Sequence, residues 1–324
     1  MKIRHWSLKN GSGMNMVAKD LAEAESALGH DSLLVSSFDR AEWPQGEGAE
    51  IHVSHTHVPD PIRKAGGKIV WVGHGTPEHC FKVTSEEVAR GGYGHGDCLM
   101  LVQWWMQHAD AIVTFWPRHA WFWSKMCDKH TVVDCVPLGV KLDFWGAEKS
   151  AGKYIGNPSV LTAENCHDIK WPLDLAVMWE DIYNELPDAQ LHMIYLPTDQ
   201  HQVWFPLMNR IGTTFKAYAS NKVFDKPNLR NAFKSVDYVT SFVRYGDFNK
   251  ITLEAKASGA KIISFKGSPY ADFWIDEGDQ RFQFEQMIKI FRGETLPRET
   301  TPVLDISETA KHMISIYERV LQEK

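Results

Sequence analysis

The chain has 324 residues, of which 44% are hydrophobic and 23% are charged, and its formal net charge at pH 7 is −6. These values are typical of a globular protein large enough for two domains. The acidic balance argues against a protein that binds nucleic acid through its overall charge. No apolar run approaches the roughly 20 residues that span a bilayer, so no integral membrane segment is predicted.

The first part of the chain alternates between predicted strands and helices. Strands are predicted over residues 2–8, 32–36, 51–53, 68–72, 111–115 and 131–135, and helices over 14–28 and 97–106. A tight loop at Gly11, Ser12 and Gly13 follows the first strand. Strands separated by helices predict a parallel, doubly wound sheet.

Residues 141–156 show little periodicity and are interpreted as a linker, after which the same plan repeats. Further strands are predicted over 159–162, 191–195, 238–241 and 261–265, with helices over 173–186, 284–291 and 307–323 and a short helix that ends at Gly259. The predicted fold class is therefore α/β, with two doubly wound domains.

The last predicted helix has a broad apolar stripe made of Ala310, Met313, Ile314, Ile316, Tyr317 and Val320. Such a stripe has to be covered by another part of the protein. We expect domains at residues 1–145 and 157–302, with residues 303–324 crossing back to pack on the first domain.

The cysteines and the amino terminus bear on location. There are five cysteines, and none forms a Cys-x-x-Cys pair, which favours reduced thiols. Residues 1–6 enter a strand without a signal-peptide pattern. We therefore expect a cytoplasmic protein.

Histidines are frequent early in the chain, and a metal site has to be considered. They include His52, His55, His57, His74, His79 and His95. Their spacings match no common zinc motif, and no His-Glu-x-x-His is present. No metal site is predicted.

Residues 246–259, Gly-Asp-Phe-Asn-Lys-Ile-Thr-Leu-Glu-Ala-Lys-Ala-Ser-Gly, form the most informative segment. They lie between two predicted strands and carry Glu254 on a short helix. In open α/β sheets, ligands bind beyond the carboxyl ends of the strands, where helix N-termini offer free N–H groups to phosphate. A carboxylate one turn into the helix would suit a ribose hydroxyl pair. The alternative is an ordinary strand–helix–strand unit with a solvent-facing glutamate.

Two tandem Rossmann-like halves occur in dehydrogenases, periplasmic binding proteins and some glycosyltransferases. The first loop does not continue as Gly-x-Gly-x-x-Gly, so a dinucleotide fingerprint is missing. Residues 253–259, Leu-Glu-Ala-Lys-Ala-Ser-Gly, resemble the end of the Glu-x7-Glu donor-site signature of the GT-B glycosyltransferases of family 4. Glu254 takes the place of the second glutamate, whereas Gly246 stands at the position of the first.

Four further segments resemble that family in the same order along the chain. They are the glycine-rich loop with Gly29-His30 after it, the pair His55 and His57, residues 70–74 ending in His74, and residues 136–144, which resemble the family's interdomain segment. The resemblance implies a GT-B fold, with two Rossmann-like domains facing across a cleft. It also implies a metal-independent, retaining glycosyltransferase that needs no cofactor and takes a nucleotide sugar, with UDP expected as the nucleotide.

The same resemblance implies a set of site residues. Lys170 would neutralise the donor diphosphate, helped by Arg244, while His74 would face the donor sugar and Glu254 would hold the ribose. The family's arginine position is Asn165 here, which removes one charge. The remaining expected donor contacts are Gly11, Ser12, Gly13, Asn165, Asp247, Phe248 and Asn249.

The acceptor is left open at this point, as is the oligomeric state. Members of the family glycosylate glycans, lipids and small molecules, but bacteriophage enzymes of this fold glucosylate hydroxymethylcytosine in DNA. Residues 116–123, Trp-Pro-Arg-His-Ala-Trp-Phe-Trp, combine aromatic and basic side chains that suit stacking on a base, or else pack into the core. A second alternative is a non-catalytic nucleotide-sugar-binding relic.

Overall fold

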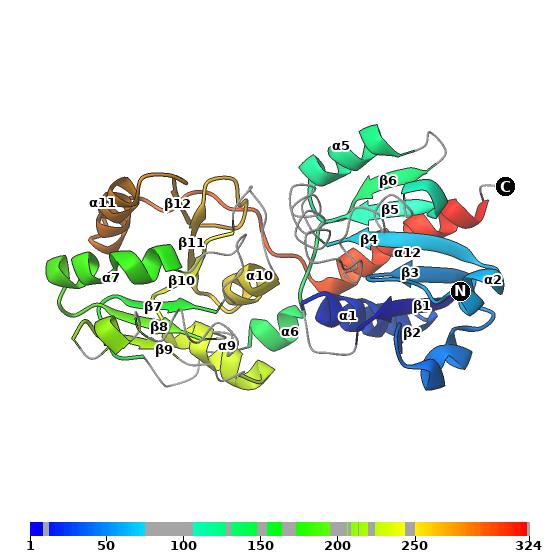
Figure 1. Ribbon diagram of the computed structural model, residues 1–324, viewed down its shortest axis with the longest axis horizontal. Coiled ribbons are helices and arrows are strands. Elements are labelled where there is room, and N and C mark those ends of the chain that lie inside the picture. Colours follow the sequence, from blue (N-terminus) through cyan, green and yellow to red (C-terminus); the bar gives the residue numbers. More distant parts are fainter. Residues whose placement is uncertain are drawn as a thin grey trace. The chain divides into compact units, whose positions relative to one another are not determined.

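The computed structural model describes residues 1–8, 13–74, 106–127, 131–147, 154–163, 173–194, 206, 209–212, 214–219, 224–243 and 250–322. The chain forms two compact units (Figure 1). Unit 1 comprises Met1–Lys141 and Leu304–Lys324, and unit 2 comprises Leu142–Val303. In the described part of the chain, no helix is both long and apolar enough to cross a membrane.

Unit 1 is built on a six-stranded parallel sheet with the order β2-β1-β3-β4-β5-β6. Its strands are β1 (Lys2–Ser7), β2 (Asp31–Ser36), β3 (Ile51–Ser54), β4 (Lys68–Gly73), β5 (Ala111–Thr114) and β6 (Val132–Cys135). Its helices are α1 (Gly13–Ala27), the 3₁₀ helix η1 (Arg40–Gly46), α2 (Asp60–Lys64), α5 (Pro117–Met126) and α12 (Ile306–Gln322). The central strands are buried, as expected for a sheet covered by helices on both faces.

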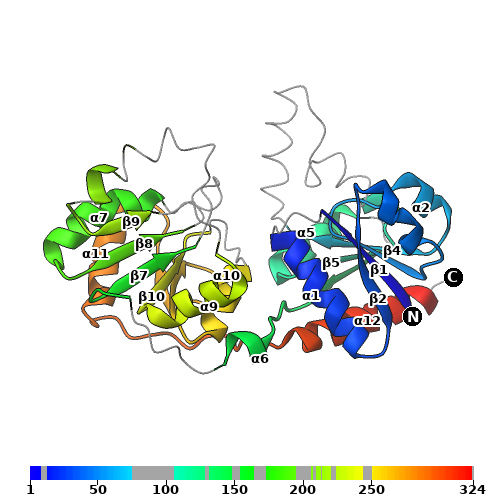
Figure 2. The same cartoon turned by 90° about the horizontal axis from the view of Figure 1, so that it is seen from below.

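The C-terminal helix α12 lies beside α1 in unit 1 (Figure 2). Its buried face includes Ala310, Met313, Ile316, Tyr317 and Val320, which belong to the apolar stripe seen in the sequence. The chain enters this helix through backbone hydrogen bonds that join Val140 to Leu304 and Ile306. Thr309 adds a side-chain bond, because its Oγ1 accepts from the Gly139 N–H at 2.8 Å.

Unit 2 contains a second six-stranded parallel sheet, with the order β12-β11-β10-β7-β8-β9. Its strands are β7 (Ser159–Thr162), β8 (Gln190–Met193), β9 (Ala217–Ala219), β10 (Tyr238–Ser241), β11 (Lys261–Phe265) and β12 (Phe273–Ile275). Its helices are α6 (Leu142–Trp145), α7 (Leu173–Glu185), α9 (Lys226–Ser235), α10 (Lys250–Ala257) and α11 (Gln280–Phe291). Trp179 is fully buried among the strands and helices of its core.

The predicted α/β class, with two Rossmann-like sheets, is confirmed. Several short elements were not predicted: β9, β12, α2, α6 and α9. Helix α9 had local signals, since Asp225 caps it through Asn228 N–H at 2.9 Å and Pro227 lies in its first turn. The region interpreted as a linker contains α6, whose Trp145 is buried against Phe233.

Candidate functional site

Each sheet has one point where the strand order reverses, and candidate ligand-binding residues are expected near it. In unit 1 it lies between β1 and β3, and in unit 2 between β7 and β10. In open parallel sheets, ligands bind beyond the carboxyl ends of the strands at such a switch point. Of the predicted site residues, the structure describes Gly13, His74 and Glu254.

In unit 1, three histidines from neighbouring strands are hydrogen-bonded in series. His5 lies in β1, His55 follows β3, and His74 follows β4. The His5 Nδ1 and His55 Nε2 atoms are 3.0 Å apart, and the His55 Nδ1 and His74 Nε2 atoms are 2.7 Å apart. The series therefore runs across the switch point and reaches the carboxyl end of β4.

A buried carboxylate forms the inner end of this series. Glu25, on α1, has its Oε2 atom 2.8 Å from His5 Nε2, and Oε2 also accepts a hydrogen bond from the Ser32 hydroxyl at 2.6 Å. The Glu25 Oε1 atom accepts a hydrogen bond from the Tyr317 hydroxyl on α12 at 3.0 Å. His5, Glu25 and Tyr317 are fully buried.

The surroundings keep the outer histidines neutral. Burial lowers the pKa of His74 to about 3, and burial, reinforced by His74 and His5, holds the pKa of His55 well below its ordinary value. At the other end, burial and the adjacent Glu25 raise the pKa of Tyr317 well above its ordinary value. At neutral pH, Tyr317 is therefore a hydrogen-bond donor, and His55 and His74 are uncharged.

The loop expected to approach a diphosphate is described only at Gly13, the first residue of α1. A side chain added at Gly13 would have no atom within 4 Å, so local packing does not require glycine there. Gly11 and Ser12 lie outside the described residues.

In unit 2, Glu254 lies on α10, the helix that follows switch strand β10. Glu254 is only 6% exposed, and Lys250 in the same helix is 9% exposed. The Glu254 Oε1 atom is 3.7 Å from the Lys250 Nζ atom. Glu254 is therefore not the solvent-facing glutamate of an ordinary surface helix. It forms part of a buried ion pair in the first turns of α10.

Hydroxyl groups join α10 to the ends of the neighbouring strands. Thr252 Oγ1 donates to Ser241 Oγ at 2.9 Å, and Ser264 Oγ donates to the Ser241 carbonyl at 2.7 Å. All three residues are buried. The first bond joins α10 to the end of β10, and the second joins the ends of β10 and β11.

Besides Gly11 and Ser12, six more predicted site residues lie outside the described residues. They are Asn165, Lys170, Arg244, Asp247, Phe248 and Asn249. Their roles stay predictions.

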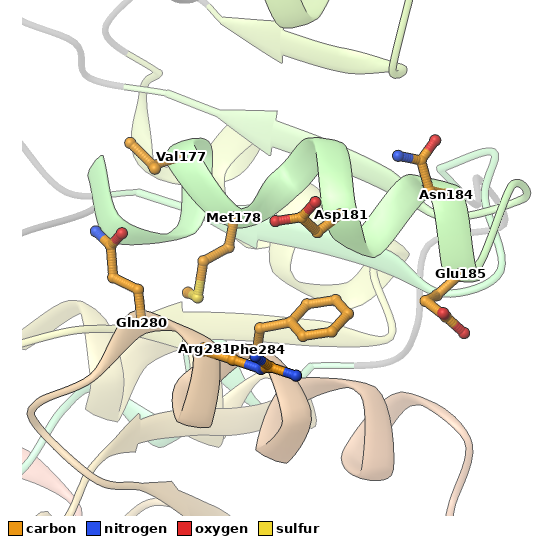
Figure 3. A pocket seen from close by; sticks show the side chains of 8 residues that line it. All are labelled: Val177, Met178, Asp181, Asn184, Glu185, Gln280, Arg281 and Phe284. Atoms are coloured by element: carbon orange, nitrogen blue, oxygen red, sulfur yellow. The ribbon is translucent and has the colours of Figure 1, made fainter.

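A groove of about 530 Å³ lies between α7 and α11 of unit 2 (Figure 3). Met178 and Phe284 lie between the two helices, and the polar lining includes Asp181, Glu185 and Arg281. Arg292 Nη2 is 2.6 Å from Glu185 Oε2. Two carboxylates here disfavour a diphosphate, so α10 remains the better donor candidate.

Within the described ranges, no group of His, Cys, Asp and Glu side chains could hold a metal ion. In the series of unit 1, the ring nitrogens face one another in pairs and do not converge on one point. The expectation that the protein works without a metal is not tested by this geometry.

Sequence reasoning identified His55 and His74 but missed His5, Glu25 and Tyr317 as part of the same network. A signal was present, because Glu25 lies four residues after Leu21 on the apolar face of a helix. A carboxylate at such a position is buried and needs donors. Nothing in the sequence shows that Tyr317 is one of them, since it is distant in the chain.

Comparison with known proteins gives results at the level of structure alone. No protein-family model matches the chain. No curated protein matches it in sequence.

Solved structures match along nearly the whole chain. Sucrose-phosphate synthase from Thermosynechococcus elongatus has a TM-score of 0.70 at 12% identity, covering 98% of this chain and 96% of that one. HepE from Anabaena, solved with UDP-glucose, has a TM-score of 0.64 at 10% identity, covering 100% and 98%. The lipopolysaccharide outer core galactosyltransferase WaaB has a TM-score of 0.61 at 11% identity, covering 98% and 100%. The predicted GT-B fold is thus confirmed, and assignment to family 4 in particular stays a prediction.

Proposed function

We propose that this chain is a glycosyltransferase that moves a sugar from a nucleotide sugar to an acceptor hydroxyl. The observation that carries the proposal is buried Glu254 on the helix after the switch strand of unit 2. The end-to-end structural match to glycosyltransferases gives it further support. HepE was solved with UDP-glucose, which favours UDP as the nucleotide.

On the donor side, Glu254 accepts hydrogen bonds from the ribose hydroxyls. The N-terminus of α10 contributes N–H groups and the positive end of the helix dipole toward phosphate. Lys170 and Arg244 supply positive charge to the diphosphate, which gains negative charge as the glycosidic bond breaks. Gly11, Ser12 and Gly13 allow the backbone to approach a phosphate closely.

The transfer is proposed to retain the anomeric configuration and to need neither metal nor cofactor. The bond from the anomeric carbon to the diphosphate oxygen breaks, and the acceptor oxygen bonds to the same face of that carbon. The leaving diphosphate takes the proton of the acceptor hydroxyl. No protein nucleophile is then required, and EDTA should leave the activity intact.

The acceptor is proposed to be a hydroxyl of a glycan, a lipid or another small molecule. The exposed aromatic side chain on α5 keeps a modified DNA base as the second candidate. Trp121 is 65% exposed, whereas Trp123 in the same helix is 1% exposed and packs in the core. A single exposed tryptophan near Arg118 suits stacking on one base.

The test begins with the donor, because it needs no knowledge of the acceptor. Purified protein is incubated with a panel of nucleotide sugars, including UDP-glucose, and release of the nucleoside diphosphate is measured. An active transferase hydrolyses one donor slowly, and Glu254→Ala lowers this rate. Glu285→Ala, at an exposed position of α11, serves as the control.

Binding without any turnover would support the relic and contradict the enzyme. With a donor in hand, acceptors are screened by mass shift, with hydroxymethylated DNA among them. A mass shift on DNA alone would move the second candidate to first place.

A further inference from the structure

The hydrogen bonds of the unit 1 series have a direction that is set at the inner end. An ionised carboxylate only accepts hydrogen bonds. Its Oε1 accepts from Tyr317 and its Oε2 accepts from Ser32, and Oε2 also lies 2.8 Å from His5 Nε2. His5 must therefore carry its hydrogen on Nε2.

The direction then passes outward from ring to ring. A neutral imidazole has one donor and one acceptor nitrogen. A neutral His5 with its hydrogen on Nε2 accepts at Nδ1 from His55 Nε2, and neutral His55 in turn accepts at Nδ1 from His74 Nε2. All three rings then carry the hydrogen on Nε2, and His74 is left with a lone pair on Nδ1.

His74 is positioned to use that lone pair. Its side chain is partly exposed, and within the described residues its Nδ1 atom makes no hydrogen bond. The Phe115 ring contacts it edge-on, with centroids 5.6 Å apart. His74 is thus the outer end of a series whose other members, His5, His55 and Glu25, are buried.

We propose that Glu25, His5 and His55 are positioning residues that hold His74 in the Nε2–H tautomer, so that Nδ1 accepts a hydrogen bond from a hydroxyl of the bound sugar or acceptor. This inference rests on the proposed function for the identity of the ligand, but not for the tautomer. The orientation of a functional histidine by a partner on its second nitrogen is a general device, here extended through two further rings.

The fixed tautomer predicts a preference in chemistry. A hydroxyl donates to Nδ1, whereas a carboxylate or phosphate oxygen would place two acceptors against each other and leave both without a hydrogen. A site built to accept from a hydroxyl rejects groups that lack the hydrogen. The group next to His74 is therefore a neutral hydroxyl and not an acidic substituent.

Core packing alone does not account for the network. A buried carboxylate and three buried or partly buried imidazoles need desolvation, which an apolar cluster of the same volume avoids. The low pKa values of His55 and His74 agree with a series of neutral rings. Each neutral ring donates through Nε2 and accepts through Nδ1. The acceptor oxygen of Glu25 therefore determines which nitrogen of His74 is the acceptor, and no proton has to move.

The test uses the full chain with ¹⁵N-labelled histidine and reads the tautomer of each ring by long-range ¹H–¹⁵N correlation. In the wild type at pH 7, His5, His55 and His74 should each show a protonated Nε2 and an unprotonated Nδ1. A protonated Nδ1 at His74 in the wild type would overturn the proposal, with no variant needed.

Glu25→Gln then tests the origin of the direction, because an amide both donates and accepts. It permits the opposite polarity, so the Nδ1–H tautomer of His74 should appear. His52 serves as an internal control, since it bonds to Trp6 and Gly66 instead of to the series, and its resonances should not move. Tyr317→Phe keeps the carboxylate and should leave all three tautomers unchanged.

Activity measurements link the tautomer to the reaction. Glu25→Gln should lower kcat/KM for the donor identified in the panel at least tenfold, and the matched control Glu23→Gln, at an exposed position of the same helix, should change it less than twofold. An unchanged His74 tautomer in Glu25→Gln contradicts the relay whatever the activity. Correct tautomers in a protein without turnover would instead refute the proposed function and leave the relay standing.

Discussion

Both units have a buried carboxylate on the helix that follows a switch strand, but the two carboxylates are held in different ways. Glu25 in unit 1 is surrounded by three hydrogen-bond donors at 2.6 to 3.0 Å, and it meets the partly exposed His74 only through two other rings. Glu254 in unit 2 lies in the first turns of a helix, with an ammonium group at 3.7 Å. The first carboxylate lies inside a hydrogen-bond network that leads to His74, and the second lies on the helix that follows the switch strand of unit 2.

This difference suits the two carboxylates to different roles, one in orienting other residues and one in binding a ligand. A carboxylate with three short internal hydrogen bonds is suited to orient other residues, because exchanging those donors for a ligand would leave buried groups unpaired. A carboxylate beside a helix N-terminus lies where phosphate and ribose groups bind in open sheets. Changes made in each unit separately test this division of roles.

Removal of residues 307–324 should damage unit 1 far more than unit 2. The deletion takes away most of α12, including Tyr317 and the apolar residues that cover α1. Each buried aliphatic or aromatic side chain contributes about 1.5–3 kcal/mol, so the loss is comparable with the stability of a whole domain. Hydrogen exchange should show new exposure in residues 1–141 with unit 2 protected. New exposure confined to residues 142–303 would contradict the arrangement.

Lys170→Ala should lower kcat of the transfer about 100-fold, equivalent to about 2.7 kcal/mol in the barrier. Its effect on the apparent donor KM should be smaller, because the diphosphate gains charge mainly in the transition state. Steady-state kinetics measures both, with Lys289→Ala on α11 as the control. Near-normal turnover would mean that other groups hold the diphosphate.

Glu254→Ala should weaken donor binding by about 1–3 kcal/mol, the usual cost of losing hydrogen bonds to a charged group. Titration calorimetry with the donor from the panel measures it directly. Glu285→Ala, at an exposed position of α11, is the matched control and should leave donor binding unchanged. If Glu254→Ala bound the donor as tightly as the wild type, Glu254 would not contact the donor, and its proposed role would be contradicted.

Much of the fold follows from local patterns, because short β-branched runs between amphipathic helices predict parallel strands. The small elements were missed for physical reasons. Strand β9 has three residues, of which Tyr218 is half exposed, and β12 has three, too few for a periodic signal in either case. Tertiary pairing decides such elements more than propensity does.

The sequence could point to a candidate site residue only where a motif carried it, and the role of that residue stays a prediction. Glu254 stands in a recognisable segment, and the structure describes it as buried on the helix after the switch strand. The link from Glu25 to His5 depends on strand register and helix packing across 20 residues of chain, and the link to Tyr317 spans 292. No spacing rule connects residues that meet only through the tertiary fold.

The last prediction compares the two units in acid. Burial holds the pKa values of His52, His55, His57 and His74 below 6.5 in unit 1, whereas among the described residues of unit 2 only His192 is held this way, at about 4. A histidine whose pKa falls on folding binds more protons when unfolded, so its contribution to stability is complete above pH 6.5 and declines as the pH falls toward the folded pKa.

For His74, this contribution to stability is lost between pH 6.5 and about pH 3. Within that range the free energy of unfolding falls by about 1.4 kcal/mol for each pH unit. Urea unfolding between pH 7 and pH 5, followed by hydrogen exchange in each unit, should show unit 1 losing stability more steeply than unit 2. His74→Gln should reduce the unit 1 slope by about the contribution of one histidine, because the replacement does not titrate. Equal slopes in both units, or an unchanged slope in His74→Gln, would show that His74 titrates in the folded protein much as it does in the unfolded chain. That result would also remove the support that a neutral His74 gives to the hydrogen-bond direction set by Glu25.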